Sequence, residues 1–165
     1  MPSIIKKLLR DRCWLILTVV LASSFHLAAQ APSPVSVSPS SGSGSQQLFT
    51  FTFTDPVSWT HIQSAQVIAG GVFGQASSCY FYLSGNLAYL ADDSGTFHNP
   101  VTFGSAATIE NSRCIIDAGS SSMTGSGTTW TVNLSILFKS AAAGSYSTMM
   151  EVYNGVDSGW AQRGS

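Results

Sequence analysis

Residues 48–54 read Leu-Phe-Thr-Phe-Thr-Phe-Thr, and the alternation of apolar and polar side chains from Phe49 onward decides the fold class. Successive side chains of a β-strand point to opposite faces, so Phe49, Phe51 and Phe53 share one face and the threonines share the other. A period of two over this length predicts a half-buried strand with the phenylalanines in the core. The Asp-Pro pair that follows is expected to end it.

The same alternation returns near the other end of the chain, in residues 130–138. Its predicted core face consists of Trp130, Val132, Leu134, Ile136 and Phe138. Between the two strands, residues 79–91 have a hairpin pattern, with two apolar runs separated by a short Ser-Gly-Asn loop. Residues 120–127 are rich in serine and glycine and are interpreted as a flexible loop.

These patterns together predict an all-β fold. After residue 29, no segment has the hydrophobic period of an α-helix. About seven or eight short strands separated by turn residues predict a single antiparallel β-sandwich. A small jelly roll or barrel is the alternative.

The first 29 residues have the order of a secretory signal peptide. Four basic side chains precede an apolar run, and small residues follow up to Ala29, after which we expect cleavage. The alternative is an uncleaved membrane anchor, but the apolar run is about 10–15 residues long, shorter than the roughly 20 that a spanning helix needs. We therefore predict a secreted or cell-surface protein with no stable membrane insertion after cleavage.

Removal of the signal would also remove Cys13 and leave two cysteines, Cys79 and Cys114. In the oxidising space outside the cytoplasm, such a pair predicts a disulfide. The rival interpretation is a metal site, which would need further ligands, and only His61 and His98 remain as candidates. No cofactor is expected.

The exported part divides into two segments. Residues 30–47 are rich in serine, proline and glycine, which predicts a linker or a short edge strand, where proline is tolerated. Residues 48–165 are predicted to form the β-sandwich domain.

Six linked motifs are spread over nearly all of the chain after residue 29. They are a Pro-Val-Ser-Val-Ser-Pro-Ser-Ser-Gly segment (34–42), the Phe/Thr strand with its Asp-Pro end (49–56), the Cys-Tyr-x-Tyr hairpin (79–95), Asn-Ser-x-Cys (111–114), a Gly-Ser-Gly loop with a long alternating strand and an Ala-Gly turn (125–144), and Ser-Gly-Trp-x-Gln-x-Gly (158–164). Together they resemble an uncharacterised immunoglobulin- or fibronectin-like β-sandwich module of secreted and surface proteins of soil bacteria. The resemblance implies that sandwich type and assigns no catalytic residues. That module usually continues with another short strand, so the domain is expected to lack its last strand or to be truncated.

Charge disfavours several classes of partner. Charged side chains make up 9% of the chain, against roughly 25% in ordinary globular domains. After residue 29 there are three basic and seven acidic side chains. So few cations cannot neutralise a run of phosphates, and nucleic-acid binding and an electrostatic membrane anchor are both disfavoured.

No catalytic constellation is recognisable, so no enzyme is predicted. A hydrolase would need at least His61 or His98 together with a serine and a carboxylate.

Aromatic side chains are the best candidates for contact with a ligand or partner. They are Trp59, Tyr80, Tyr82, Tyr89 and Trp160. If Cys79 points inward, strand alternation makes Tyr80 and Tyr82 point outward together. Asp92 and Asp93 are a weak calcium candidate, but a plain turn uses the same residues and is the favoured interpretation.

The sequence therefore predicts an exported, non-enzymatic module with a structural, adhesion or protein-binding role. The alternative is a carbohydrate-binding module, in which Tyr80, Tyr82 or Trp59 would form a planar, exposed platform for a glycan.

Overall fold

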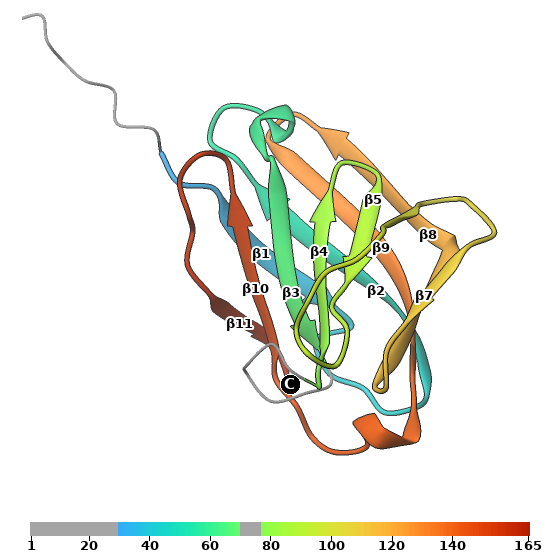
Figure 1. Ribbon diagram of the computed structural model, residues 1–165. Helices are drawn as coiled ribbons and strands as arrows, with labels where there is room; N and C mark the ends of the chain where they lie inside the picture. The colour runs from blue at the N-terminus through green and yellow to red at the C-terminus, as the bar shows by residue number, and fades with distance from the viewer. Residues whose placement is uncertain (1–29, 70–76) are drawn as a thin grey trace, which may run out of the picture.

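The computed structural model of the chain describes residues 30–69 and 77–165, which form two antiparallel β-sheets packed face to face (Figure 1). The first sheet has the order β1 (Ser33–Ser38), β2 (Gln46–Thr54), β9 (Thr129–Phe138), β8 (Cys114–Ser126) and β7 (Thr108–Glu110). The second has the order β11 (Ala161–Gly164), β10 (Thr148–Tyr153), β3 (Ser64–Ala69), β4 (Cys79–Ser84), β5 (Leu87–Leu90) and β6 (Val101–Thr102). Two short 3₁₀ turns, η1 (Trp59–His61) and η2 (Ser140–Ala142), follow β2 and β9. The predicted all-β sandwich is confirmed.

The predicted Phe/Thr strand is β2, which pairs with β9 along its whole length. Phe51 and Phe53 are buried, and Phe53 packs on Trp130 of β9 with 5.4 Å between the ring centroids. Across the core, Phe51 meets Phe81 of β4 edge to face, with centroids 5.7 Å apart. The main core is therefore built from most of the alternating positions that the sequence predicted, whereas Phe49 and Phe138, also predicted for the core, are only partly buried against it.

The predicted disulfide joins the two sheets. Cys79 begins β4 and Cys114 begins β8, with an S–S bond of 2.06 Å and Cα atoms 5.7 Å apart. Both cysteines are fully buried. By restricting the unfolded chain, a cross-link between residues 35 apart stabilises the fold by about 3–4 kcal/mol.

The described residues form eleven strands, more than the seven or eight expected. The strands without an expected counterpart are β6 and β11, both short and both at a sheet edge. β1 lies within residues 30–47, so this proline-rich segment contains an edge strand paired with β2. β6 has two residues and β11 has four, too few for an alternation of side chains to stand out.

β11 closes one side of the sandwich. It pairs with β10 in the second sheet, while Nε of Arg163 donates to the carbonyl of Pro34 in β1 (2.7 Å). The main-chain N–H of Ser165 donates to the carbonyl of Ser40 (2.7 Å). A β-carbon at Gly164 would lie 2.7 Å from that same oxygen, so the close approach requires glycine. The closing Trp-x-Gln-x-Gly motif thus holds the edges of the two sheets together.

The expected flexible loop at residues 120–127 is a wrong prediction, because β8 continues to Ser126. After a register shift between Asp117 and Ser122, these residues pair with β9 up to the turn at Gly127, which has a φ of 56°. A run of serines offers no apolar alternation to detect, yet its main-chain groups pair with β9 as those of any other strand do.

Candidate functional site

The outer face of the second sheet carries most of the aromatic side chains that were predicted to contact a partner. In β4 the disulfide-bonded Cys79 faces the core, so Tyr80 and Tyr82 face outward together, as the alternation predicted. Pairing of β4 with β5 sets Tyr89 opposite Tyr82. Trp160, in the segment before β11, reaches the same face and lies beside Tyr80.

Phe97 joins these four side chains into one group. Its ring centroid lies 4.9 Å from that of Tyr80 and 5.9 Å from that of Tyr82. Tyr82 in turn lies 5.5 Å from Tyr89, and Tyr80 lies 6.2 Å from Trp160. We call Tyr80, Tyr82, Tyr89, Phe97 and Trp160 the aromatic band. Phe97 was not identified from the sequence, because it stands alone among turn residues and an isolated β-bridge to Ala91 folds it back over the sheet.

The rings of the aromatic band do not share a plane. The interplanar angle is 73° between Tyr82 and Tyr89 and 55° between Tyr80 and Phe97. Tyr80 itself is only 2% exposed, because Phe97 and Trp160 pack against it. A sugar ring stacks on a flat, open aromatic face, so tilted and mutually packed rings form a poor platform for a glycan.

A polar network borders the aromatic band. Tyr80 donates its hydroxyl proton to Oε1 of Gln66, and Nε2 of Gln66 donates to Oε1 of Glu151 (2.6 Å). Strand pairing sets Gln66 between Glu151 and Tyr82. Burial and then the nearby charge of Asp157 raise the pKa of Glu151. Burial and then the charge of Glu151 raise the pKa of Tyr80. The face therefore combines aromatic rings with a poorly solvated carboxyl group.

Trp59 lies in η1 and the structure does not bring it together with the other four predicted residues. Its indole ring packs against Gly125 of β8, where an ideal β-carbon would lie 2.1 Å from the ring. Its main-chain N–H donates to the carbonyl of Gly127 (3.0 Å), and its ring packs against the main core. Trp59 therefore holds η1 against the β8–β9 hairpin.

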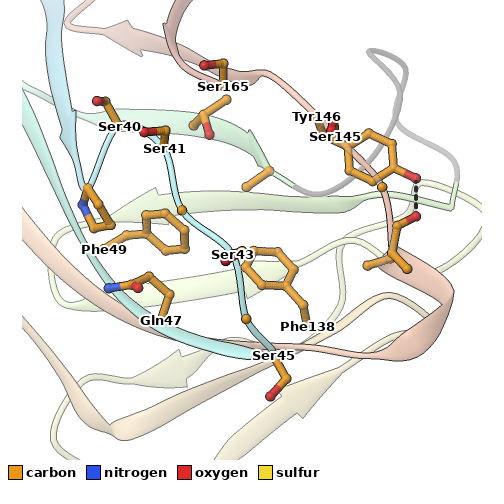
Figure 2. Close-up of a pocket in the computed structure, with 18 of the residues that line it drawn as sticks. Ser40, Ser41, Ser43, Ser45, Gln47, Phe49, Phe138, Ser145, Tyr146 and Ser165 are labelled. Atoms are coloured by element: carbon orange, nitrogen blue, oxygen red, sulfur yellow. Dashed lines mark hydrogen bonds between the residues drawn. The ribbon is translucent and has the colours of Figure 1, made fainter.

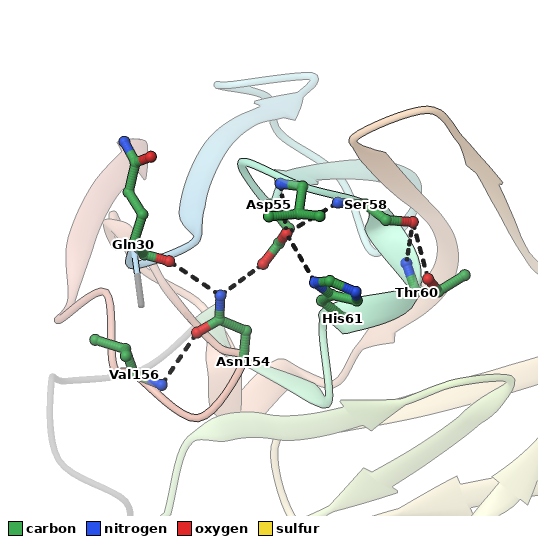
Figure 3. Close-up of polar contacts among 8 residues, drawn as sticks. Gln30, Asp55, Ser58, Thr60, His61, Asn154 and Val156 are labelled. Carbon is green, nitrogen blue, oxygen red and sulfur yellow. Dashed lines mark hydrogen bonds and ion pairs between the residues drawn. The ribbon is translucent and has the colours of Figure 1, made fainter. Parts of the chain in front are cut away.

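A separate polar cluster surrounds Asp55, the buried residue that follows β2 (Figure 3). Its Oδ1 accepts the main-chain N–H groups of Val57 and Ser58 (2.8 and 3.0 Å), and its Oδ2 accepts from Nδ2 of Asn154 (2.6 Å). Nδ1 of His61 lies 3.7 Å from Oδ1. Burial acts to raise the pKa of Asp55, but the hydrogen bonds and the nearby imidazole outweigh it and lower the pKa.

Both histidines that were considered for a hydrolase lie beside an aspartate and a serine. Near His61, however, the Ser58 hydroxyl pairs with a threonine hydroxyl at 2.8 Å. Nε2 of His98 lies 2.8 Å from Asp92, and Ser94 donates its hydroxyl proton to the same aspartate. Neither serine is therefore held against its histidine as acyl transfer requires.

The Asp92-Asp93 pair forms a turn. Asp92 accepts the main-chain N–H of Ser94 (2.8 Å), and Asp93 accepts the N–H and the hydroxyl of Ser112 (3.2 and 2.7 Å). Hydrogen bonds, from Ser94 first and then from His98, hold the pKa of Asp92 far below its usual value. Among residues 30–69 and 77–165, no group of three or more Asp, Glu, His or Cys side chains could hold a metal ion. These contacts favour the plain turn over a calcium site.

Comparisons with protein-family models, with curated proteins and with solved structures gave no match to this chain. Within the described part of the chain, no helix has the length and apolar character needed to cross a membrane. The disulfide is consistent with an extracytoplasmic protein. Functional inference therefore depends on the geometry of the chain itself.

Proposed function

We propose that this chain is an exported, immunoglobulin-like β-sandwich module without enzymatic activity that binds a protein partner through the aromatic band. The observation that carries the proposal is the convergence of five aromatic side chains on one outer sheet face, four of them half-buried. Export is supported by the disulfide and by the signal-like order of residues 1–29, which lie outside the described residues.

The packing of the aromatic band favours a protein partner over a glycan. Tyrosine, tryptophan and phenylalanine are enriched at the centres of protein interfaces, where they contribute much of the binding free energy. Here each ring is already held by its neighbours, so little side-chain entropy is lost on binding. Edges and partly open faces presented at several angles fit the irregular surface of a protein better than the flat face of a sugar ring.

The polar border indicates the chemistry of the partner. Glu151 is 9% exposed and lies near the charge of Asp157, with Gln66 as its hydrogen-bond donor. A lysine or arginine from the partner would relieve the repulsion between the two carboxylates and form a charge-assisted hydrogen bond. We therefore expect an apolar surface that carries at least one cation.

The sheet edges favour docking on the face of the sheet over addition of a strand. β6 has only two residues, and β11 is tied to β1 through Arg163. Short or covered edges offer few free main-chain groups to an incoming strand.

Site-specific photo-crosslinking tests the proposal. A photoreactive phenylalanine analogue at position 89 in the aromatic band should capture one partner from the native exported fraction, while the same analogue at position 52, on the outer face of the first sheet, should not. Binding of the captured partner should then weaken by about tenfold or more in Tyr82→Ala and Trp160→Ala, because hot-spot rings are lost. Thr52→Ala serves as the matched control.

Equal capture from both faces would count against the proposal. Unchanged affinity in both aromatic variants, with the fold intact by circular dichroism, would also overturn it.

A further inference from the structure

A groove of about 700 Å³ opens at one end of the sandwich, where β1 leads into β2 and β9 leads into β10 (Figure 2). Small-molecule sites usually measure about 300–1,000 Å³, so the groove has the size of a ligand site. Its walls include residues 39–45 on one side and residues 139, 140 and 142–146 on the other. None of the lining residues that the structure describes belongs to the aromatic band, so a ligand here would be separate from the proposed protein partner.

Three aromatic rings form the apolar part of the groove. Phe49 and Phe138 meet edge to face with centroids 6.1 Å apart, and Phe49 also stacks on the buried Phe51 at 5.8 Å. Tyr146 comes from the loop after β9, where a β-carbon at Gly144 would lie 2.9 Å from its ring. All three lining rings are half-buried, so each keeps some surface for a ligand.

The rest of the lining is neutral and rich in hydroxyl groups. Seven serines and a threonine line the groove, together with the amide of Gln47. Among the described lining residues, Lys139 is the one with a charged side chain, and its ammonium group already donates to Oε2 of Glu110 (2.8 Å) and to the carbonyl of Asn111 (2.6 Å). The described lining side chains therefore offer hydroxyl donors and acceptors and no unpaired side-chain charge.

We propose that this groove binds the end of a neutral oligosaccharide. Sugar hydroxyls both donate and accept hydrogen bonds, as serine hydroxyls do, while the C–H face of a sugar ring can lie against Phe138 or Tyr146. A purely apolar ligand would leave the serine hydroxyls without partners, and an anionic ligand would find the Lys139 charge already neutralised. These two mismatches select a neutral, polyhydroxylated ligand.

The groove is supported from behind by the two sheets. The main-chain N–H of Phe138 donates to the carbonyl of Ser45, which ties one wall to the end of β9. Strand pairing sets Cys114 opposite Phe138 and Cys79 opposite the lining residue Ala69. The disulfide thus joins β4 and β8, the strands that pair with the two strands carrying Ala69 and Phe138, and a rigid support reduces the cost of binding.

The test uses the whole chain, purified with its disulfide intact, on an array of neutral and anionic glycans. Cellotriose, maltotriose and triacetylchitotriose are then titrated in saturation-transfer NMR, with sialyllactose as the anionic probe. We expect at least one neutral glycan to bind with a dissociation constant of about 1 mM or tighter. Phe138→Ala and Tyr146→Ala should each weaken that binding by about tenfold.

Tyr89→Ala is the matched control, since it removes a ring from the aromatic band and should leave glycan binding unchanged. This variant also separates the two proposals, because it should weaken binding of the protein partner and leave glycan binding in the groove unchanged. Tyr146 lies in a loop, so its variant keeps the test valid if Phe138→Ala fails to fold. Binding of no neutral glycan, or of anionic glycans only, would overturn the proposal. Self-association that Phe138→Ala abolishes would overturn it too, by showing that a second copy fills the groove.

Discussion

The indole ring of Trp59 occupies the space that a side chain at position 125 would need. An ideal β-carbon on Gly125 would lie 2.1 Å from Cδ2 of the ring and 2.2 Å from Cε2. Gly125 has no positive φ, so the position requires glycine for space and not for backbone conformation. The contact couples η1, which follows the Phe/Thr strand, to the serine-rich end of β8.

Gly125→Ala should therefore lower the free energy of unfolding by about 1–3 kcal/mol, because the added methyl group forces the ring to move. Urea unfolding followed by tryptophan fluorescence measures the change. Gly42→Ala is the control, since a β-carbon at that position would have no atom within 4 Å and its φ is not positive. Equal destabilisation in the two variants would contradict the steric explanation.

Loss of the disulfide should lower the free energy of unfolding by about 3–4 kcal/mol, because the unfolded chain regains the freedom that the cross-link between Cys79 and Cys114 removes. The measurement is urea unfolding of the unmodified protein with and without dithiothreitol. The double variant Cys79→Ala, Cys114→Ala should be insensitive to the reductant. A reductant effect of the same size in that variant would show that the change has another cause.

Asn154→Ala should make the protein less resistant to acid. The lowered pKa of Asp55 contributes stability that is present above the ordinary aspartate value of about 3.9 and is lost as the pH falls through the folded value. Without the amide that donates to Asp55, its pKa rises and acid unfolding begins at a higher pH. Circular dichroism during an acid titration measures the midpoint. Asn99→Ala, at an exposed amide, should leave the midpoint unchanged.

Glu151→Gln should stabilise the protein more at pH 7 than at pH 4. A raised carboxyl pKa means that its stabilising contribution is present below the unfolded value of about 4.3 and is lost as the pH rises through the folded value. The glutamine oxygen can still accept from Gln66, but it has no charge to desolvate. Urea unfolding at both pH values gives the comparison. Asp157→Asn should also stabilise the protein more at pH 7 than at pH 4, but by a smaller amount. An equal effect of Glu151→Gln at both pH values would contradict a raised pKa of Glu151.

The main strands and the disulfide of the sandwich could be predicted, because the sequence patterns that indicate them are local. Phe51 and Phe53 alternate with threonines, and such alternation places them on one face whatever strand lies beside them. Because Cys13 lies in the first 29 residues, which were expected to be removed as a signal peptide, only one pairing was left for Cys79 and Cys114. The edge strands β6 and β11 and the second half of β8 escaped prediction, because pairing with a neighbouring strand and not side-chain pattern holds them in the sheet.

The groove and much of the aromatic band could not be predicted, because they bring together distant parts of the chain. Phe49 and Phe138 are far apart in the sequence and meet only because β2 pairs with β9. Phe97 reaches Tyr80 through a turn that has no periodic pattern. No local feature of the sequence records either contact.

Tyr80 and Tyr82 show which properties the sequence determines and which depend on the tertiary structure. The order of amino acids was enough to place both on the outer face of β4, since side-chain direction in a strand depends only on position. Tertiary structure alone decided that Tyr80 is buried and Tyr82 half-buried, because Phe97 and Trp160 pack against Tyr80 from remote segments. Direction is a property of the local backbone, whereas burial depends on which distant side chains arrive to exclude water.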